Sequence, residues 1–217
     1  MLNGVFDLNW VTALCCWIEN NLFNISQEIL NNYLHQGKQV KLSPYDPRRI
    51  EEIKALFTKT FSDSEGQSEG ELIGNLVYEL MTGTDSHDLY GFVATEKNKI
   101  VGSIFFSKIT FESKINAFIL SPAAIHTDFQ KQGIGQKLIK FGLNTLKECG
   151  IELIFTYGDP NFYTKVGFKP VTEKQVKAPF KLTYPEGWLG LSLVSKKIES
   201  IAGNSYCVEA LNNPQYW

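Results

Sequence analysis

Apolar residues in the first part of the chain recur at the period of an α-helix. They are separated by three or four positions: Val11, Leu14, Ile18, Leu22, Ile25, Ile29 and Tyr33. This spacing predicts a helical face. Polar residues at 20–26 divide the stretch into two helices, and Gly37 is a plausible stop. We therefore expect an N-terminal helical appendage at residues 1–38, packed on the domain as a hairpin. A dimer contact and a partner helix are the alternatives.

The pattern changes to that of an α/β domain from residue 39 onward. Residues 39–43 alternate as in a strand, and Asp46 followed by Pro47 is a helix-start signal. Apolar stripes at helical spacing then predict helices over 50–61 and 71–81, with a polar loop at 62–70 between them. The predicted appendage thus ends at residue 38, and residues 39–217 form the main domain.

Strands dominate the remainder of the chain. We predict a hairpin of strands 89–95 and 100–111, a third strand at 116–126, a helix at 134–148 that Gly150 terminates, and a buried strand at 151–157. A short helix over 161–166 and strands near 168–173, 188–194 and 205–210 complete the α/β (α+β) domain. Because a helix joins strands 116–126 and 151–157, these two should be parallel neighbours.

A glycine turn lies between the strand 116–126 and the helix 134–148. It reads Gln130-Lys-Gln-Gly-Ile-Gly-Gln136. The first turn of a helix leaves backbone N–H groups unpaired and favours negative charge, while glycine lets a phosphate approach the backbone closely. A dinucleotide-binding fingerprint would require glycine where Leu138 stands, and a P-loop would require Gly-Lys-Ser/Thr, which the chain lacks.

Two motifs in this part of the chain resemble those of one family. Gln130-x-x-Gly133-x-Gly135 resembles the pyrophosphate-binding motif of the GNAT acetyltransferase superfamily, and Tyr163-x-Lys-x-Gly-Phe168 resembles its second signature. The longer runs 120–135, 158–170 and 187–193 are similar to the YhbS-like branch of bacterial N-acetyltransferases. The resemblance covers residues 40–217 and implies the GNAT fold, a mixed central sheet with splayed parallel strands flanked by helices.

The resemblance also implies a reaction, the transfer of an acetyl group from acetyl-CoA to a primary amine by direct attack. Backbone N–H groups of residues 131–136 would face the pyrophosphate. Backbone groups near Ile125 and His126 would pair with the pantetheine arm, and a nearby N–H would stabilise the oxyanion. The implied cofactor-binding residues are Ile125, His126, Gln130, Lys131, Gln132, Gly133, Ile134, Gly135 and Gln136.

Tyr163 matches the general acid of the family, which would protonate the CoA thiolate. A phenol has a reference pKa of about 10 and an alkyl thiol one of about 8.5, close enough for proton sharing. The alternative is an aromatic side chain that only packs on the sheet.

The general base is harder to assign, because residues 116–121 contain no carboxylate where many GNAT enzymes have Glu. The His126 imidazole has a suitable reference pKa of about 6.5. Other candidates are Glu79, Glu112, Asp159, the terminal carboxylate and a water relay. The missing carboxylate also keeps open a catalytically silent acyl-CoA-binding regulatory or interaction module. A second alternative is an interaction protein built around residues 1–37.

The amino-acid composition limits the classes of binding partner that we expect. Apolar residues make up 43% of the 217 residues, charged residues 20%, and the net charge is −2, which describes a globular protein and gives no case for nucleic-acid binding. The four cysteines and three histidines are scattered, so we expect no metal. No apolar run approaches the ~20 residues of a membrane helix. We expect a cytoplasmic enzyme without a membrane partner, with a small-molecule or protein amine as acceptor, and a homodimer as one alternative for its assembly. Helices 47–81 and the C-terminal segment would build the acceptor site.

Overall fold

A computed structural model describes residues 40–195 and 197–217. The helical appendage predicted for residues 1–38 lies outside these described residues. The helices and strands are β1 (Lys41–Pro44), α2 (Ile50–Glu65), α3 (Gln67–Gly83), β2 (Leu89–Glu96), β3 (Lys99–Phe111), β4 (Ala117–Ile125), α4 (Ile134–Glu148), β5 (Leu153–Tyr157), α5 (Pro160–Tyr163), β6 (Lys169–Pro170), β7 (Trp188–Ser192) and β8 (Ser205–Cys207).

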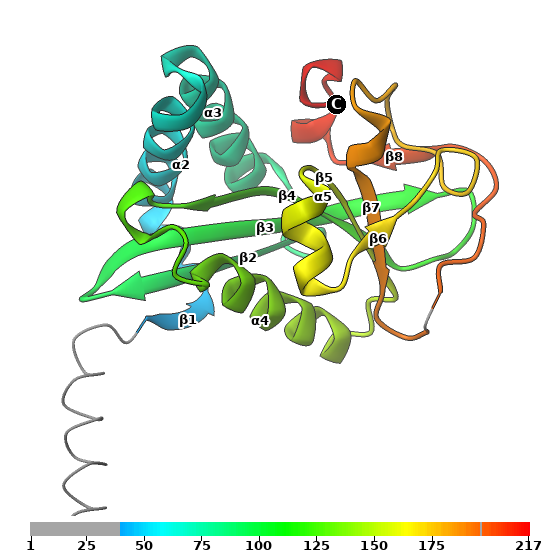
Figure 1. Cartoon of the computed structure of the whole chain (residues 1–217), viewed down its shortest axis with the longest axis horizontal. Coiled ribbons are helices and arrows are strands. Elements are labelled where there is room, and N and C mark those ends of the chain that lie inside the picture. The colour runs from blue at the N-terminus through cyan, green and yellow to red at the C-terminus, as the bar shows by residue number, and fades with distance from the viewer. Residues whose placement is uncertain (1–39, 196) are drawn as a thin grey trace, which may run out of the picture. The chain divides into compact units, whose positions relative to one another are not determined.

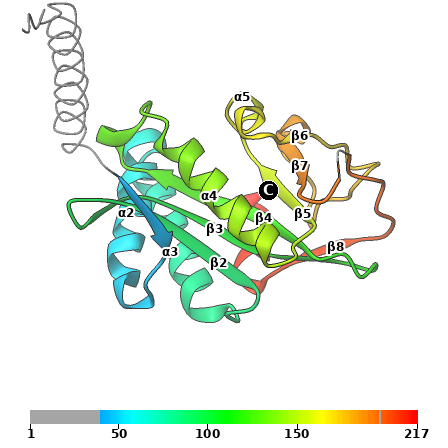
Figure 2. The same ribbon diagram turned by 90° about the horizontal axis from the view of Figure 1, so that it is seen from below.

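The strands form one mixed sheet with helices on both faces. Its order is β1-β2-β3-β4-β5-β7-β6, and β8 pairs with one end of β3. Helices α2 and α3 cover one face and α4 covers the other (Figures 1 and 2). Alternate residues of β3 serve the two cores: Phe105 packs with the α2–α3 side, whereas Ile104 and Phe106 pack with α4. The mixed sheet with helices on both faces agrees with the architecture that the sequence resemblance implied.

Strands β4 and β5 are the parallel neighbours that the sequence predicted, but they pair over only part of their length. Their register runs from Ala117 opposite Leu153 to Leu120 opposite Thr156. Strand β5 then ends at Tyr157, whereas β4 continues to Ile125. The upper part of β4 therefore loses its neighbour on that side, and the two strands part.

The pairing of β4 with β3 is also irregular, just beyond the last residue of β4 that pairs with β5. Leu120 lies opposite Phe106 and Ala123 opposite Ile104, so two residues of β4 face a single residue of β3. This β-bulge falls at Ser121 and Pro122, and proline could not have donated to a ladder. The bulge and the end of β5 together open the sheet where the cleft described below begins.

The prediction of a polar loop at residues 62–70 is wrong. Helix α2 continues to Glu65, α3 starts at Gln67, and Gly66, with φ +99°, is the only break. The two helices touch through glycine: a Cβ on Gly70 would overlap the Ser62 hydroxyl and the Thr58 carbonyl. Close contact through a residue without a side chain leaves no apolar stripe, and for this reason the sequence pattern resembled a loop.

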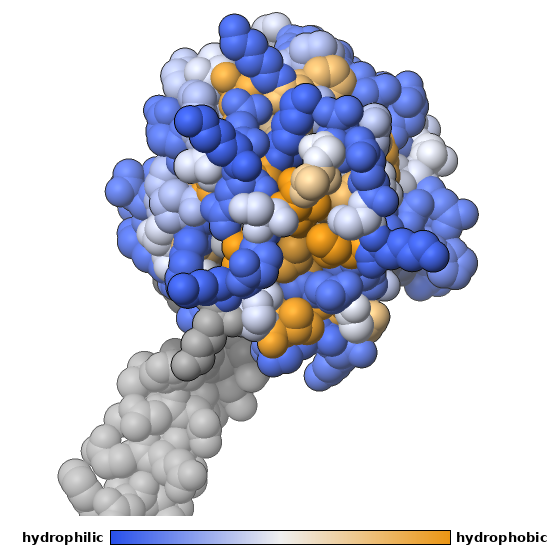
Figure 3. All heavy atoms as spheres, turned by 90° about the vertical axis from the view of Figure 1, so that its right-hand side faces the viewer, coloured by the Kyte–Doolittle hydropathy of each residue, from blue (hydrophilic) through white to orange (hydrophobic). Residues whose placement is uncertain are grey.

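The C-terminal strands are shorter than predicted. Strand β6 has two residues and β8 has three. Trp188, the first residue of β7, belongs to the core on the α2–α3 side; it is fully buried, its ring centroid lies 5.2 Å from that of Phe155, and its indole N–H donates to Val176 O at 2.9 Å. Figure 3 shows the face at this end of the sheet, where apolar atoms gather among hydrophilic ones.

Candidate functional site

The loop between β4 and α4 presents unpaired backbone donors. After a 3₁₀ turn at Thr127–Phe129, the chain reaches the start of α4 with Gly133 in the left-handed region, φ +76°. Lys137 N–H makes the first helical bond, to Gly133 O at 3.1 Å. Within residues 40–195 and 197–217, the N–H groups of residues 131–136 donate to no other group of the protein. Such a run at a helix N-terminus is an anion site.

These donors border a cavity of about 530 Å³, which we call the loop cavity. Its walls come from the loop, from the end of β4, from the last turns of α2 and from the segment around α5. Lys131 and Lys165 are the only basic residues among its described lining. A Cβ on Gly135 would lie 3.3 Å from the Phe162 ring, so glycine keeps this wall open. The loop cavity is therefore suited to a negatively charged group.

Thr60 of α2 adds an unsatisfied polar group to this cavity. Its side chain is only 7% exposed, and its Oγ1 has no hydrogen-bond partner in the described part of the chain. Thr60 lines the loop cavity. A buried hydroxyl without a partner costs free energy, so its presence beside a cavity points to a ligand that pairs with it.

A second cavity of about 460 Å³ continues the first. We call it the tyrosine cavity, because Tyr157, Tyr163 and Tyr216 line it. The two cavities share seven lining residues: Phe61, Glu65, Ala123, Ala124, Ile125, Gly135 and Phe162. They are thus two halves of one cleft, which follows the part of β4 that β5 has left.

Tyr163 lies where the two strands part. The Thr156 hydroxyl donates to Leu120 O at 2.9 Å, across the last pair of the parallel ladder, and Thr156 lies close enough to Tyr163 to influence its pKa. The Tyr163 ring packs edge-on against Phe168. Burial raises the pKa of the Tyr163 hydroxyl, and the charge of Asp159 raises it further, while the nearby Thr156 side chain opposes the shift. Tyr163 therefore stays a neutral phenol over the physiological range.

Most of the predicted cofactor-binding residues meet at the loop cavity. Its lining includes Ile125, Gln130, Lys131, Gly133, Ile134, Gly135 and Gln136. The amides of Gln130 and Gln132 brace the loop itself: Gln130 donates to Ile125 O and Gln132 to Asp128 O, each at 3.0 Å. Gln132 does not line the cavity, so the contribution of its side chain is the hydrogen bond within the loop.

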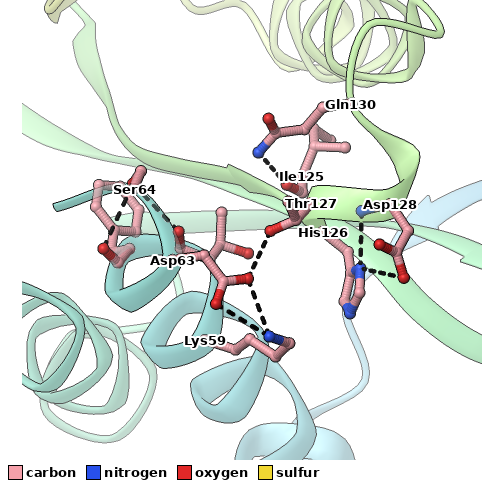
Figure 4. Close-up of polar contacts among 10 residues, drawn as sticks. Lys59, Asp63, Ser64, Ile125, His126, Thr127, Asp128 and Gln130 are labelled. Atoms are coloured by element: carbon pink, nitrogen blue, oxygen red, sulfur yellow. Dashed lines mark hydrogen bonds and ion pairs between the residues drawn. The ribbon is translucent and has the colours of Figure 1, made fainter. Parts of the chain in front are cut away.

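His126 lies apart from the cleft. Its backbone N–H donates to Val101 O at 2.9 Å, its carbonyl accepts from Phe129 N–H at 2.8 Å, and it lines neither cavity. Its imidazole Nδ1 accepts the N–H of Asp128 at 3.3 Å (Figure 4). Because backbone groups alternate along a strand, Ile125 and Ala123 direct theirs away from β3, toward the open side of β4. The backbone groups on the open side of β4 are therefore those of Ala123 and Ile125, whereas the N–H of His126 faces β3.

The other predicted base candidates are dispersed. Asp159 lines the tyrosine cavity and also caps α5 by accepting Asn161 N–H at 2.9 Å. Glu112 contacts Asn204 N–H at 3.3 Å and lines neither cavity, and Glu79 is exposed on α3. Glu65, which lines both cavities, was missed because it falls in the segment predicted to be a loop. Continuing the helical period beyond residue 61 would have found it.

Helix α2 is tied to the loop by a polar contact at the rim of the cleft. Asp63 accepts the Thr127 hydroxyl at 2.7 Å and the Lys59 ammonium at 2.9 Å (Figure 4). The bond from Thr127 and then that from Lys59 lower the pKa of Asp63. The contact joins the α2 wall of the loop cavity to the loop that carries the free N–H groups.

Two kinds of feature are absent from the described residues. None of the helices there has both the length and the apolar character needed to cross a membrane. In the same ranges, no three His, Cys, Asp or Glu side chains come together as a metal site.

The sequence and the fold can be compared with those of known proteins. Residues 87–170 match the family described as acetyltransferase (GNAT) domain. The chain is 25% identical to the uncharacterized N-acetyltransferase YjhQ of Escherichia coli K12 over 170 residues, which are 76% of this chain and 90% of that protein. It is 28% identical to the uncharacterized N-acetyltransferase YhbS of the same strain over 119 residues, 54% of this chain and 66% of YhbS.

Solved structures show the same fold. The Escherichia coli YhbS structure in complex with CoA has a TM-score of 0.69 and 21% identity, and the match covers 81% of this chain and 93% of that one. A GNAT family acetyltransferase from Brucella melitensis in complex with acetyl-CoA has a TM-score of 0.63 and 21% identity, covering 79% and 97%.

Proposed function

We propose that this chain, which contains an acetyltransferase domain of the GNAT family, moves the acetyl group of acetyl-CoA to a primary amine by direct attack on the thioester. The observation that carries the proposal is the run of free N–H groups at residues 131–136, which opens onto a cavity continuous with the one that holds Tyr163. Structures of the same fold that contain CoA and acetyl-CoA support it. We assign this activity to residues 39–217.

The loop cavity would hold the pyrophosphate of the cosubstrate. The N–H groups of residues 131–136 supply hydrogen bonds and the α4 dipole favours the negative charge. Lys131 and Lys165 add positive charge at the same end of the cleft. The Thr60 hydroxyl would find its missing partner on the bound molecule.

The open side of β4 would hold the pantetheine arm. The backbone groups of Ala123 and Ile125 point to the side that β5 has left, so an extended chain with amide groups can pair with them as a strand would. Ala123 and Ile125 line both the loop cavity and the tyrosine cavity. Strand β4 would therefore fix how far the thioester lies from the pyrophosphate of the bound cosubstrate.

Tyr163 would act as the general acid. The thiolate that leaves when the amine attacks needs one proton, and a neutral phenol in a half-buried position supplies it. The raised pKa of Tyr163 ensures that the proton is present at the start of the reaction. Asp159 and Glu65 are the only carboxylate side chains among the described lining of the tyrosine cavity, so they are our candidates for accepting the proton of the amine, directly or through water.

Thiol release is the decisive measurement. The protein is incubated with acetyl-CoA and a broad panel of primary amines, and free CoA thiol is followed while CoA binding is titrated by calorimetry. We expect CoA binding and amine-dependent thiol release. Binding without release on any amine, together with no effect of Tyr163→Phe, would instead identify a silent acyl-CoA-binding module. Absence of CoA binding would overturn the proposal altogether.

A further inference from the structure

The charges along the cleft change sign from one end to the other. The loop cavity is lined by two basic side chains, Lys131 and Lys165, and by one acidic side chain, Glu65, so the charge of its lining is net positive. The tyrosine cavity is lined by two acidic ones, Glu65 and Asp159, and its described lining contains no Lys, Arg or His. The phosphate end and the reacting end of the cleft therefore favour opposite charges.

Groups beyond the lining extend the negative field. Tyr216, at the C-terminal side of the tyrosine cavity, lies near Glu79 and Glu69 of α3. Burial raises the pKa of Tyr216, and the charges of these two glutamates raise it further. On the opposite wall, the charge of Asp159 acts in the same direction on Tyr163. Burial is the main cause of both shifts, and carboxylates from different elements of the fold act on the two phenols in the same direction.

The walls of the tyrosine cavity are aromatic as well as acidic. Five aromatic side chains line it: Phe61, Tyr157, Phe162, Tyr163 and Tyr216. Ammonium groups are attracted to aromatic faces, and alkyl chains pack against them. A cavity of about 460 Å³ lies within the size range of sites for small molecules, which is roughly 300–1,000 Å³.

We infer that the acceptor is a small organic dication: a primary amine with a second positively charged nitrogen and no carboxylate or phosphate group. Glu65 and Asp159 determine this specificity, because each attracts the second cation and repels an anionic substituent. The inference rests on the acetyl transfer proposed above. In that transfer the amine nitrogen bonds to the acetyl carbon and the C–S bond breaks. The former ammonium loses two protons: Glu65 or Asp159 accepts one directly or through water, and the other replaces the proton that Tyr163 gives to the sulfur.

Three matched amines test the inference. 1,5-Diaminopentane and lysine have the same carbon chain between their amino groups, but lysine adds a carboxylate. Pentylamine has the same chain and lacks the second ammonium. We measure the affinity of each for the CoA-loaded protein by calorimetry and kcat/KM from thiol release. We expect the diamine to exceed each of the others by about threefold, the effect of one charge contact at an exposed, solvent-screened carboxylate.

The two measurements, binding affinity and kcat/KM, distinguish failure of this inference from failure of the proposed function. Equal kcat/KM for the three amines would overturn the dication preference and leave acetyl transfer intact. If no amine releases thiol, the proposed function fails, and the binding arm still decides the inference. Lysine or pentylamine binding as tightly as the diamine would then overturn it.

Neutral variants of the two carboxylates locate the effect. Glu65→Gln and Asp159→Asn keep the shape of each side chain, and Asn retains the ability to cap α5. We expect each change to reduce the preference for the diamine over lysine, and the double variant to bring it close to parity. Glu51→Gln is the control, since it removes the same charge from an exposed position in the first turn of α2. An undiminished preference in the double variant would overturn the assignment to these residues.

Discussion

The two halves of the cleft are built in different ways. The donors of the loop cavity are main-chain N–H groups of six consecutive residues, 131–136, at the start of one helix. The tyrosine cavity instead combines side chains from α2, β4, α5 and the C-terminal segment, from Phe61 to Tyr216. The comparison teaches that the proposed phosphate site depends on one turn alone, whereas the proposed sites for acceptor binding and proton transfer depend on the whole fold.

The largest effect is expected at the tyrosine cavity. Tyr163→Phe removes the proposed acid without changing the ring, so kcat should fall by about 10²–10⁴-fold, the usual contribution of general acid catalysis. The affinity for CoA, measured by calorimetry, should not change, because the free N–H groups are at the other end. Tyr90→Phe is the control and should leave kcat unchanged. Tyr90 of β2 packs on Phe118 of β4 and lines neither cavity.

The pH profile sharpens the same test. The acid must be protonated, and burial together with Asp159 raises the pKa of Tyr163 above its usual value. The acidic form therefore persists as pH increases, and Tyr163 should produce no alkaline decrease in kcat below about pH 10. A decrease well below that pH that Tyr163→Phe abolishes would contradict the assigned environment.

The next largest effect is expected at the loop cavity. Gly133 and Gly150 lie at opposite ends of α4, both have φ +76°, and a Cβ on either would meet nothing within 4 Å. Alanine should cost each site roughly 1–2 kcal/mol of backbone strain. Only Gly133→Ala should also misalign the free N–H groups, and it should weaken CoA binding by about tenfold, or ~1.4 kcal/mol.

Gly150→Ala is therefore a matched control for backbone strain. At the C-terminal end of α4 the backbone groups bond within the chain: Ile151 N–H donates to Leu146 O at 3.1 Å. Thermal unfolding of both variants and CoA titration separate strain from ligand contact. Equal losses of CoA affinity in the two variants would mean that strain in α4, and not the local donors, controls binding.

A smaller effect with opposite signs is expected at Thr60. Thr60→Val removes a buried hydroxyl without a partner, so the free energy of unfolding of the free protein should increase by about 1 kcal/mol. CoA affinity should fall about fivefold, the value of one neutral hydrogen bond. Ser107→Ala removes another buried hydroxyl without a described partner, away from the cleft, and should stabilise without changing affinity. Unchanged affinity in Thr60→Val would show that this hydroxyl does not meet the ligand.

The smallest effect is expected at the rim. Asp63→Ala breaks the contact between α2 and Thr127, and CoA affinity should fall by no more than about threefold because the side chains are exposed and screened. Asp63→Asn can still accept from Thr127, so it should retain more affinity than Ala. A calorimetric titration of both variants is the measurement, and an equal loss in the two would assign the effect to Lys59 instead.

Much of the fold followed from hydrophobic period and glycine position. The helix 134–148 and the strands on both sides of it were predicted within two residues, because each has a clear apolar pattern and a glycine at its boundary. The loop predicted at 62–70 failed because α2 and α3 touch through Gly70, which carries no apolar signal. With that error the sequence also missed Glu65, the carboxylate common to both cavities.

The direction of the backbone groups distinguishes two neighbouring residues at the end of β4. His126 and Ile125 are adjacent in the sequence, and both were predicted to face the cosubstrate. The backbone groups of successive strand residues point to opposite neighbours, and the bond from His126 N–H to Val101 O shows that this N–H faces β3, so the groups of Ile125 face the open side. Register of this kind depends on the partner strand, so the sequence of β4 alone could not have provided it.

By itself, the sequence determined the anion site of the free N–H groups, because a glycine turn before an amphipathic helix leaves its first N–H groups unpaired whatever surrounds it. Only the tertiary structure decided what lies next to that site. The parting of β4 from β5, the bulge opposite β3 and the close packing of α2 on α3 place Tyr163, Glu65 and Asp159 around one cavity. These residues are up to 98 positions apart, from Glu65 to Tyr163. Contacts across such distances follow from packing and strand register, which no local pattern encodes.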